Sequence, residues 1–311
     1  MKLYCIFSKI KNLGIKNTIK YLLGISSQQE QIDTLYYFLN HYVDITQLPP
    51  TSDVDLRNLQ KCDIVLIKIF DKFCNKHGLD YWLDFGTLLG AVRHHGFIPW
   101  DDDMDVAMPR NDFDKACILL HELEQYGIEI TEDSKGKRIG LSYSHSQTGI
   151  WLDIFPVDSY YINSPDYKEV ENLKDKIVIY RKQYLKYKDK YSKSKLSELK
   201  KEIIGGNGIM NSQCIYYHGP EFFDSYFVLH NSDIVFPLKK IEFEGCQFNC
   251  PNDVDKYLES IYGKSFMDFP RGGIEKHDLG RGLLKTWAKH NNIKMEDINI
   301  KLLEIFNLYN K

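Results

Sequence analysis

The most informative stretch of this 311-residue chain runs Leu83-Asp-Phe-Gly-Thr-Leu-Leu-Gly-Ala-Val-Arg-His-His-Gly-Phe-Ile-Pro-Trp-Asp-Asp-Asp-Met-Asp-Val106. Aspartate fills four of the five positions from 101 to 105. Carboxylates this close together repel one another unless a cation or full solvation relieves the repulsion. Alternate residues of an extended chain share a face, so Asp101, Asp103 and Asp105 are expected to point one way while Met104 points toward a core. Such a row of carboxylates suits a hard cation, Mg²⁺ or Mn²⁺.

Residues on either side of the aspartates predict a phosphate cradle that faces this cation. We expect a short strand over residues 79–85, after which Gly86 lets the backbone turn so that N–H groups and the Thr87 hydroxyl face an anion. The helix-compatible residues 88–94 would add the positive end of a helix. Asp153 is the one charge in an apolar strand predicted over residues 150–157, and we expect it to be the third acid of the site.

Three other readings of the aspartates stay open from the residues alone. A calcium loop would use Asp101, Asp103 and Asp105 as its first three ligands, but its sixth position would be Val106 and its twelfth Asp112, where glycine and glutamate are usual. A solvated acidic turn is disfavoured by the apolar residues on both sides. A glycosyltransferase that holds a sugar nucleotide through an Asp-x-Asp motif also fits.

The remaining pattern predicts a mixed α/β fold of the α+β kind. Apolar residues recur at helical spacing from 53 to 76, and Gly78 follows as a stop signal. A second strand is expected over 104–108 and a helix from Asn111 or Asp112 to Leu123. Farther along the chain we expect helix over 166–202, short strands over 234–250 and helices over 252–262 and 283–308. No internal repeat or linker divides the chain.

Composition and charge exclude several classes of protein. The formal net charge is −3 and the pI about 6.4, which does not favour nucleic-acid binding. No apolar run reaches the roughly 18 to 20 residues that span a bilayer. The seven cysteines show no disulfide or zinc pattern, so we expect reduced thiols, Cys246 and Cys250 included, and a cytoplasmic location.

Two basic segments are candidates for contact with an anionic surface. Residues 1–29 hold five lysines, no acid and interleaved apolar residues, which is typical of a helix at the inner face of a membrane or of one docked on the protein body. Residues 181–201 hold nine basic residues against Asp189 and Glu198. Most such runs are solvated helix faces, although an anionic substrate or a membrane also fits.

The central motifs resemble those of the LicD family, which includes bacterial phosphocholine transferases and is similar to the fukutin-related proteins that transfer ribitol phosphate. The first block runs from Tyr81 through Arg93 and from Gly96 to Asp105, and Leu152–Asp158 resembles the next. Shorter likenesses to the C-terminal part lie at Phe236-Pro237, Phe243-Glu244-Gly245, Tyr257-Leu258 and Tyr262-Gly263. This resemblance implies a nucleotidyltransferase-fold core with a small mixed sheet, flanking helices and a helical insertion at about 166–202.

The resemblance also implies domain bounds. Residues 1–50 would be a basic N-terminal extension, residues 51–280 the catalytic domain and residues 281–311 a C-terminal helix. Near the C-terminus the family leads us to expect a proline-rich segment with a histidine. This chain has Pro270-Arg-Gly-Gly and His277 there, which assigns no role to that histidine.

A cytidine-diphosphate-linked donor follows from the same resemblance. Asp103 and Asp105 would hold one or two Mg²⁺ or Mn²⁺ ions against the donor diphosphate, with Asp101 as a further ligand. Asp153 would share a metal or accept the proton of an acceptor hydroxyl. The residues expected to bind phosphate or substrate are Gly86, Thr87, Arg93 and Trp100.

The expected reaction moves a phospho-alcohol to a hydroxyl of a capsule, lipopolysaccharide or teichoic-acid-like glycan, with a lipid-linked acceptor compatible with the basic N-terminus. Phosphocholine is slightly favoured because Tyr81, Trp82, Trp100 and Trp151 lie beside the motifs and aromatic faces bind quaternary ammonium groups. Ribitol or glycerol phosphate is the alternative. A different class, a non-catalytic glycan- or nucleotide-binding relative, is disfavoured because the carboxylates are kept. His94 and His95 are expected to be loop residues and not bases.

Overall fold

The computed structural model describes residues 28–132, 137–143, 146–162, 167–205, 213–221, 228–270 and 279–309. The chain forms two compact units, residues 1–47 with 267–273, and residues 48–266 with 274–311. The first unit contains helix α2 (Gln28–Tyr42) and the short helix η1 (Ile45–Gln47), and within it the Phe269 N–H donates to Asn40 Oδ1 at 2.9 Å. Residues 1–27 of the predicted basic stretch and His277 lie outside the described residues.

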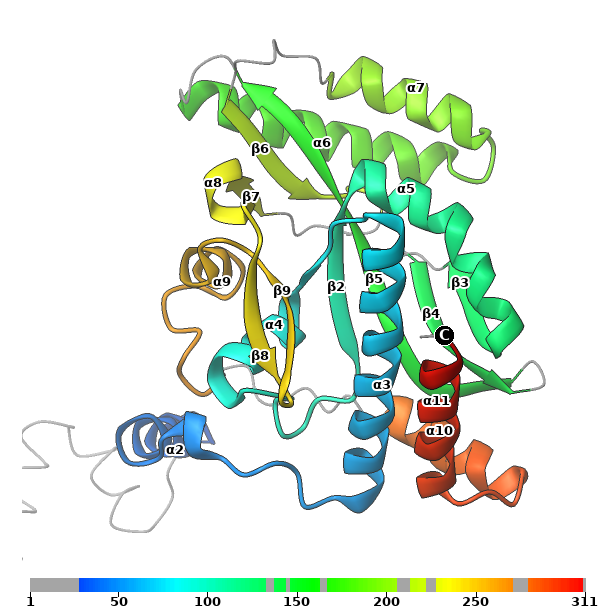
Figure 1. Ribbon diagram of the computed structural model, residues 1–311. Coiled ribbons are helices and arrows are strands. Elements are labelled where there is room, and N and C mark those ends of the chain that lie inside the picture. The colour runs from blue at the N-terminus through cyan, green and yellow to red at the C-terminus, as the bar shows by residue number, and fades with distance from the viewer. Residues whose placement is uncertain are drawn as a thin grey trace, which may run out of the picture. The chain divides into compact units, whose positions relative to one another are not determined.

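The second unit is built on a seven-stranded mixed sheet. Its strands are β1 (Trp82–Leu83), β2 (Met104–Pro109), β3 (Ile128–Glu132), β4 (Lys137–Tyr143), β5 (Ser146–Ile162), β6 (Gln213–His218) and β7 (Leu229–Asn231). The order is β1-β2-β5-β4-β3, while β6 pairs with the second half of β5 and β7 pairs with β6. Among the strands that the structure describes, only β2 and β5 pair in parallel, in the middle of the sheet (Figure 1). These two strands carry the predicted acids.

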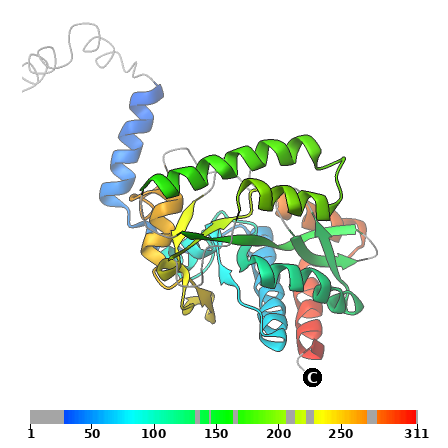
Figure 2. The ribbon, with the colours of Figure 1, turned by 90° about the horizontal axis from the view of Figure 1, so that it is seen from above.

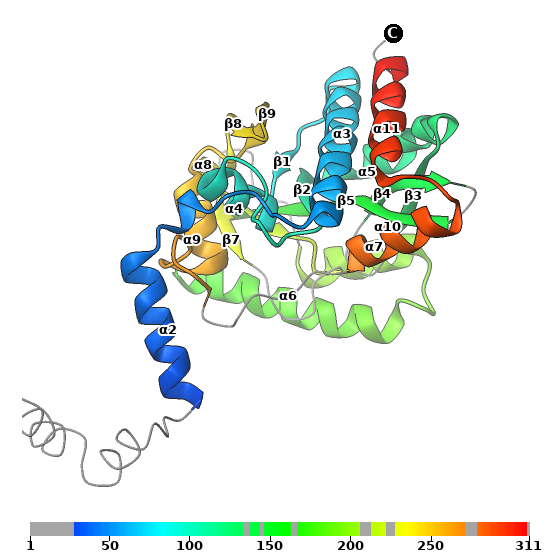
Figure 3. The same ribbon diagram turned by 90° about the horizontal axis from the view of Figure 1, so that it is seen from below.

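Helices cover both faces of this sheet. On one face lie α3 (Val54–His77) and α11 (Met295–Tyr309), and on the other α6 (Tyr167–Tyr187) and α7 (Lys193–Ile203) (Figures 2 and 3). Helix α10 (Leu279–His290) precedes α11. Smaller helices connect the strands: α4 (Phe85–His94), α5 (Arg110–Leu119), η2 (Leu120–Tyr126), α8 (Ser232–Val235) and α9 (Val254–Tyr262).

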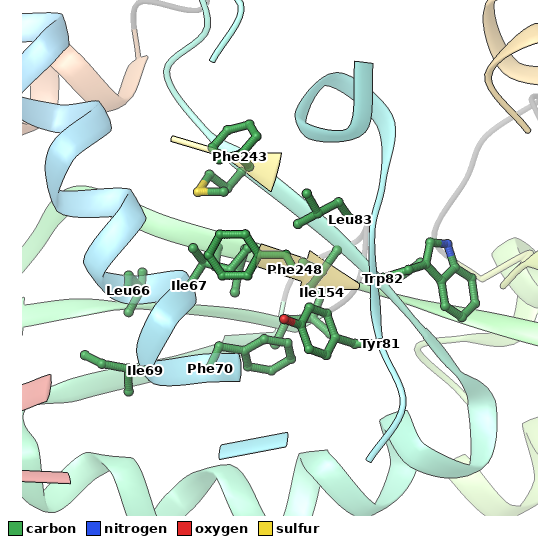
Figure 4. Packing of buried hydrophobic residues seen from close by; sticks show 14 of the residues in the cluster. Leu66, Ile67, Ile69, Phe70, Tyr81, Trp82, Leu83, Ile154, Phe243 and Phe248 are labelled. Atoms are coloured by element: carbon green, nitrogen blue, oxygen red, sulfur yellow. The ribbon is translucent and has the colours of Figure 1, made fainter. Parts of the chain in front are cut away.

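The main core lies between α3 and the sheet. Leu66, Ile67 and Phe70 of α3 are fully buried against strand residues such as Ile154, and Tyr81 and Trp82 lie in the same cluster (Figure 4). A second, smaller core joins α6 and α7 to β5, β6 and β7. Burial of apolar surface on this scale supplies the dominant favourable term in folding, at roughly 25 cal/mol per Å².

Helix α3 is specified at both ends by local sequence. The Asp53 carboxylate accepts from the N–H groups of Asp55 and Leu56, and Gly78 ends the helix in the left-handed conformation at φ 62°. Such caps satisfy backbone groups that the helix itself leaves unpaired. The predicted helix over 53–76 is confirmed.

The C-terminal motifs form a hairpin and a helix beside α4. Strands β8 (Lys239–Phe243) and β9 (Cys246–Cys250) are joined by Glu244 and Gly245, both at positive φ, as a two-residue hairpin turn requires. The Glu244 carboxylate accepts from both terminal nitrogens of Arg57 on α3, at 2.8 and 2.7 Å. The Glu244 backbone N–H donates to the His95 carbonyl at 2.8 Å, which connects the hairpin to the end of α4.

The mixed α/β fold is confirmed, but several predicted elements are wrong in extent. The strand expected over 79–85 has only two residues, because Asp84 already caps α4 and Phe85 begins it. The strand expected over 150–157 extends to Ser146–Ile162 because β4 and β6 pair with its two ends. The single helix expected over 283–308 is two helices, separated where Asn292 takes a left-handed conformation at φ 53°. No helix among the described residues is long and apolar enough to cross a membrane.

Candidate metal centre

Three of the predicted acids come together at the sheet centre. Asp103 precedes β2, Asp105 is its second residue, and Asp153 is the register partner of Asp105 on β5. One carboxylate oxygen from each lies within 4.8 Å of the others, the only such group of metal-ligating side chains found in the described part of the chain. Met104, between Asp103 and Asp105, is fully buried, so the predicted alternation of faces is confirmed there. The arrangement offers hard oxygen ligands to one divalent cation.

The electrostatics of the three carboxylates favour a bound cation. Burial raises the pKa of Asp105 well above its usual range, and repulsion from Asp103 and Asp153 raises it further. The same causes, burial first and then Asp103, raise the pKa of Asp101. Without a cation these groups must retain protons or repel one another, whereas a divalent ion supplies the missing positive charge.

Asp101 and Asp102 lie beside the triad but not in it. A Cβ on Gly86 would be only 2.9 Å from Asp101 Oδ2, so the missing side chain makes room for this carboxylate. Asp102 Oδ2 accepts from the Gly280 N–H at the start of α10, at 2.9 Å. Because β2 begins only at Met104, Asp101 precedes the strand, and its side chain is hydrogen-bonded to that of Asp103. Its role as a further ligand stays a prediction.

The expected cradle residues hold the strand that carries Asp105. Thr87 is buried, and its Oγ1 accepts from the Asp105 N–H at 2.8 Å. The Asp84 N–H donates to the Asp105 carbonyl at 3.0 Å, so both backbone polar groups of Asp105 are held from one short segment. Gly86 is not a turn between strand and helix, as predicted, but lies in the first turn of α4. The positive φ, 39°, falls instead on Phe85.

Asp84, at the start of this segment, is the centre of a buried hydrogen-bonded group that was not predicted from the sequence. Asp84 is fully buried, and its Oδ1 accepts from the Phe85 N–H at 2.8 Å and from the Tyr257 hydroxyl at 2.9 Å. Its Oδ2 lies 2.6 Å from Nε2 of His218, the last residue of β6. We assign Nε2 as the donor, since a carboxylate oxygen accepts hydrogen bonds. An aspartate before an apolar helix is a recognisable cap, whereas nothing local marks His218.

Arg93 and Trp100 are the other two residues predicted to bind phosphate or substrate. Arg93 is buried at the C-terminal end of α4, and its Nη1 donates to the Phe266 carbonyl at 3.1 Å. Burial lowers its pKa. Trp100 is half-buried and packs against the main core. Binding of phosphate by Arg93 and of substrate by Trp100 stays a prediction.

Most of the expected aromatic box is core. Tyr81 and Trp82 are fully buried; the Tyr81 hydroxyl donates to Asp71 and the Trp82 indole to Tyr257. Trp151 is 6% exposed. The argument for choline from these three rings is therefore wrong, because a side chain without exposed surface cannot enclose a ligand. Of the four aromatic residues beside the motifs, Trp100 alone is more than slightly exposed.

The histidines after Arg93 end α4. His95 takes a left-handed conformation at φ 53° and its N–H donates to the Gly90 carbonyl. Burial, followed by the nearby Arg93 charge, lowers the pKa of His94 to about 4, so this ring is neutral at pH 7.

Residues 78–202 match the family described as "LicD/FKTN/FKRP, nucleotidyltransferase domain". Over this range the chain is similar to LicD-family domains. The matched range contains all three triad acids and extends through α6 into the last turn of α7.

Curated relatives resemble parts of the chain. The lipopolysaccharide cholinephosphotransferase LicD of Haemophilus influenzae is 40% identical over 80 residues, 25% of this chain and 30% of that protein. The ribitol 5-phosphate transferase FKRP of Homo sapiens is 55% identical over 31 residues, 10% of this chain and 6% of that protein. The mannosyltransferase regulator 4 of Saccharomyces cerevisiae is 27% identical over 119 residues, 33% of this chain and 10% of that protein. The alignments thus span less than a third of each relative's length.

Proposed function

We propose that this chain is a metal-dependent transferase that moves a phospho-alcohol from a CDP-linked donor to a hydroxyl of a cell-surface glycan. The observation that carries the proposal is the meeting of Asp103, Asp105 and Asp153 within the range that matches the LicD family. Phosphocholine is the favoured group and a polyol phosphate the alternative. Retention of three clustered carboxylates argues against a non-catalytic binding protein.

The triad fits Mg²⁺ or Mn²⁺ by the chemistry of its donors. Each acid offers an oxygen, and no cysteine or histidine takes part among the described residues, which suits a hard cation. A divalent ion held there would polarise the transferred phosphoryl group and neutralise charge on the leaving nucleotide. Three ligands from the protein leave positions for donor oxygens.

The chain's own residues would then divide the remaining work. Asp103 and Asp105 hold the ion, and Thr87 fixes the backbone of Asp105. Asp153 lies on the neighbouring strand, where it completes the ligand set or accepts the proton of the attacking hydroxyl. Gly86 and Thr87 belong to the first turn of α4, whose N–H groups form a positive end that attracts phosphate oxygens.

The choice of donor rests on the relatives. The 80-residue likeness to a cholinephosphotransferase is longer than the 31-residue likeness to a ribitol 5-phosphate transferase, so phosphocholine is placed first. A quaternary ammonium group gains about 0.5 to 2 kcal/mol from a well-placed aromatic face. Trp100 is the side chain we assign to that contact, and Trp100→Ala should raise the KM for CDP-choline more than that for CDP-ribitol.

The acceptor is proposed to be a capsule, lipopolysaccharide or teichoic-acid-like glycan, by analogy with the lipopolysaccharide named for the relative from Haemophilus influenzae. A lipid-linked acceptor would bring the protein to the inner face of the cell membrane, where the basic residues 1–29 would contact anionic lipid.

The experiment is a donor panel. The full chain is incubated with Mg²⁺ and CDP-choline, CDP-ribitol, CDP-glycerol or CTP, and CMP and pyrophosphate are measured. CMP from CDP-choline supports the favoured reading, and CMP from a polyol donor alone keeps the reaction class but replaces choline. Pyrophosphate from CTP alone would show an ordinary nucleotidyltransferase and contradict the proposal.

A further inference from the structure

The backbone of Asp105 depends on residues that lie far from it in sequence. Its N–H is held by Thr87 and its carbonyl by Asp84, so movement of the Asp84–Thr87 segment would rotate the strand that presents the Asp105 carboxylate. Beyond that segment, β1 pairs with β2 only through Trp82 and Leu83. Strand β5 holds β2 on its other side, so on the β1 side the position of Asp105 depends on whatever holds Asp84.

His218 and Tyr257 hold Asp84. The carboxylate makes three contacts, to the Phe85 N–H at 2.8 Å, the Tyr257 hydroxyl at 2.9 Å and His218 Nε2 at 2.6 Å. His218 is 3% exposed and lies on β6, which pairs with β5 at Val157. The contact of His218 with Asp84 therefore links the end of β6 to the start of α4.

The same histidine supports a strained residue. Phe85 has φ 39°, a left-handed conformation that is unfavourable for a bulky residue. The His218 ring stacks on the Phe85 ring with centroids 4.8 Å apart, and Phe155 of β5 meets Phe85 edge-on at 5.3 Å. Strain of this kind persists only where the surroundings enforce it, and here it lies one residue before Gly86.

Stability alone does not account for this polar group. A buried hydrogen bond is often little more stabilising than apolar residues of the same shape, because both partners give up their hydrogen bonds to water. The nearby His230 differs from His218, because it makes no hydrogen bond to Asp84. Its ring is buried and stacks on Tyr257 with the ring centroids 4.1 Å apart. Burial lowers the pKa of His230 to about 3. His230 thus packs as a neutral ring, whereas His218 donates to a carboxylate.

We propose that His218 and Asp84 are positioning residues that fix the direction of the Asp105 carboxylate and so set the affinity of the metal centre without touching the ion. The inference rests on the proposed metal site. Partners that orient a ligand from behind typically change metal affinity or activity by about 10- to 100-fold when they are removed.

The test measures Mn²⁺ affinity of the full chain by electron paramagnetic resonance, with thermal unfolding followed in parallel. His218→Leu removes the donor, and we expect Mn²⁺ to bind about 10-fold or more weakly, with a higher Mg²⁺ concentration for half-maximal activity. His218→Gln places an amide N–H near the position of Nε2 and should recover most of the affinity. His230→Phe, the matched control, should bind Mn²⁺ as the wild type does, even if its unfolding temperature shifts.

The possible outcomes separate the positioning role of His218 from the existence of the metal site. Wild-type affinity in folded His218→Leu overturns the positioning role and leaves the metal site intact. Equal weakening in His230→Phe shows general loosening of this region and also overturns the role. If His218→Leu does not fold, His218→Asn serves instead, since its shorter amide cannot reach Asp84, and wild-type affinity there has the same meaning. Absence of Mn²⁺ binding by the wild-type chain overturns the metal site itself, and the inference with it.

Discussion

At the scale of single residues, Asp63 shows how far the negative charge of the clustered aspartates extends into the core. It lies in the middle of α3, is 1% exposed, and has its pKa raised well above the usual range by burial first, then by repulsion from Asp103 and Asp102. The folded chain therefore keeps a proton on Asp63 at a pH where the unfolded chain has lost it.

Asp63→Asn should change how stability depends on pH. A carboxyl group with a raised folded pKa destabilises the fold increasingly as pH rises above the unfolded value of about 4, and asparagine removes that effect. In urea unfolding with EDTA, the variant should gain stability relative to the wild type between pH 4 and pH 7. A difference between the two proteins that stays constant over this range would contradict the assignment.

The individual site residues differ in how far sequence could predict them. Asp103, Asp105 and Asp153 could be predicted because clustered or isolated charges among apolar residues are costly without a function. Asp84 and His218 were missed because their meaning depends on a contact across 134 positions of the chain. The prediction that Tyr81 and Trp82 bind choline was wrong, because nearness to a motif in sequence does not show whether a ring faces the core or the solvent.

At the scale of elements, a buried ionic network fastens the α6–α7 insertion to the sheet. Asp158 of β5 accepts from Arg110 Nε at 2.8 Å and from Lys200 Nζ at 2.5 Å, and Glu221 accepts from the same two cations at 3.1 and 2.9 Å. Although burial opposes ionisation, Lys200 and Arg110 lower the pKa of Asp158 to about 2. The network joins α5, α7 and β5, so the insertion is held by charge as well as by its small core.

Asp158→Asn should loosen this attachment. Removal of one member of a buried ionic group typically costs about 3 to 5 kcal/mol, because the remaining charges lose their partner. Since the folded pKa is depressed, the stabilisation is complete above pH 4 and is lost as pH falls toward 2. Urea unfolding should therefore show a gap between wild type and variant that is wide at pH 6 and closes near pH 2. A gap independent of pH would show that the carboxylate is not ionised.

Elements with their own local signals were predicted well, and those that depend on partners were not. Capping residues and helical periodicity specify α3, and a run of apolar residues interrupted only by Asp105 marks β2. Strand β6, Gln213–His218, was not predicted from the sequence. It is a strand in the structure because β5 and β7 pair with it on its two sides. Strand β1 has two residues, too few for periodicity to detect. Tertiary pairing accounts for most of the missed sheet.

At the scale of the whole molecule, residues 1–29 and the α6–α7 insertion are the two basic regions. In the insertion, Lys186, Lys190 and Lys193 are exposed around the turn between the helices. A polybasic segment gains about 1 kcal/mol per lysine near an anionic bilayer, and salt weakens that attraction.

Deletion of residues 1–29 should release the chain from anionic vesicles, and high salt should do the same to the intact protein. Co-sedimentation with phosphatidylglycerol-containing vesicles measures both effects. Charge reversal of Lys186, Lys190 and Lys193 is the matched control and should leave binding nearly unchanged. Release by this control but not by the deletion would move the membrane contact to the insertion, and intact protein that never sediments would end the membrane proposal.

The measurement that tests the central claim most directly is Mg²⁺-dependent release of CMP from the CDP-linked donor that the panel selects. The account predicts release in Mg²⁺ and none in EDTA, with loss of about 100-fold or more in Asp103→Ala and in Asp105→Ala while circular dichroism shows an intact fold. Asp153→Asn should lose most activity with little change in nucleotide binding, and Asp255→Ala, which changes an exposed aspartate of α9, should behave as the wild type. CMP release that persists in EDTA, or in folded Asp105→Ala, would contradict it.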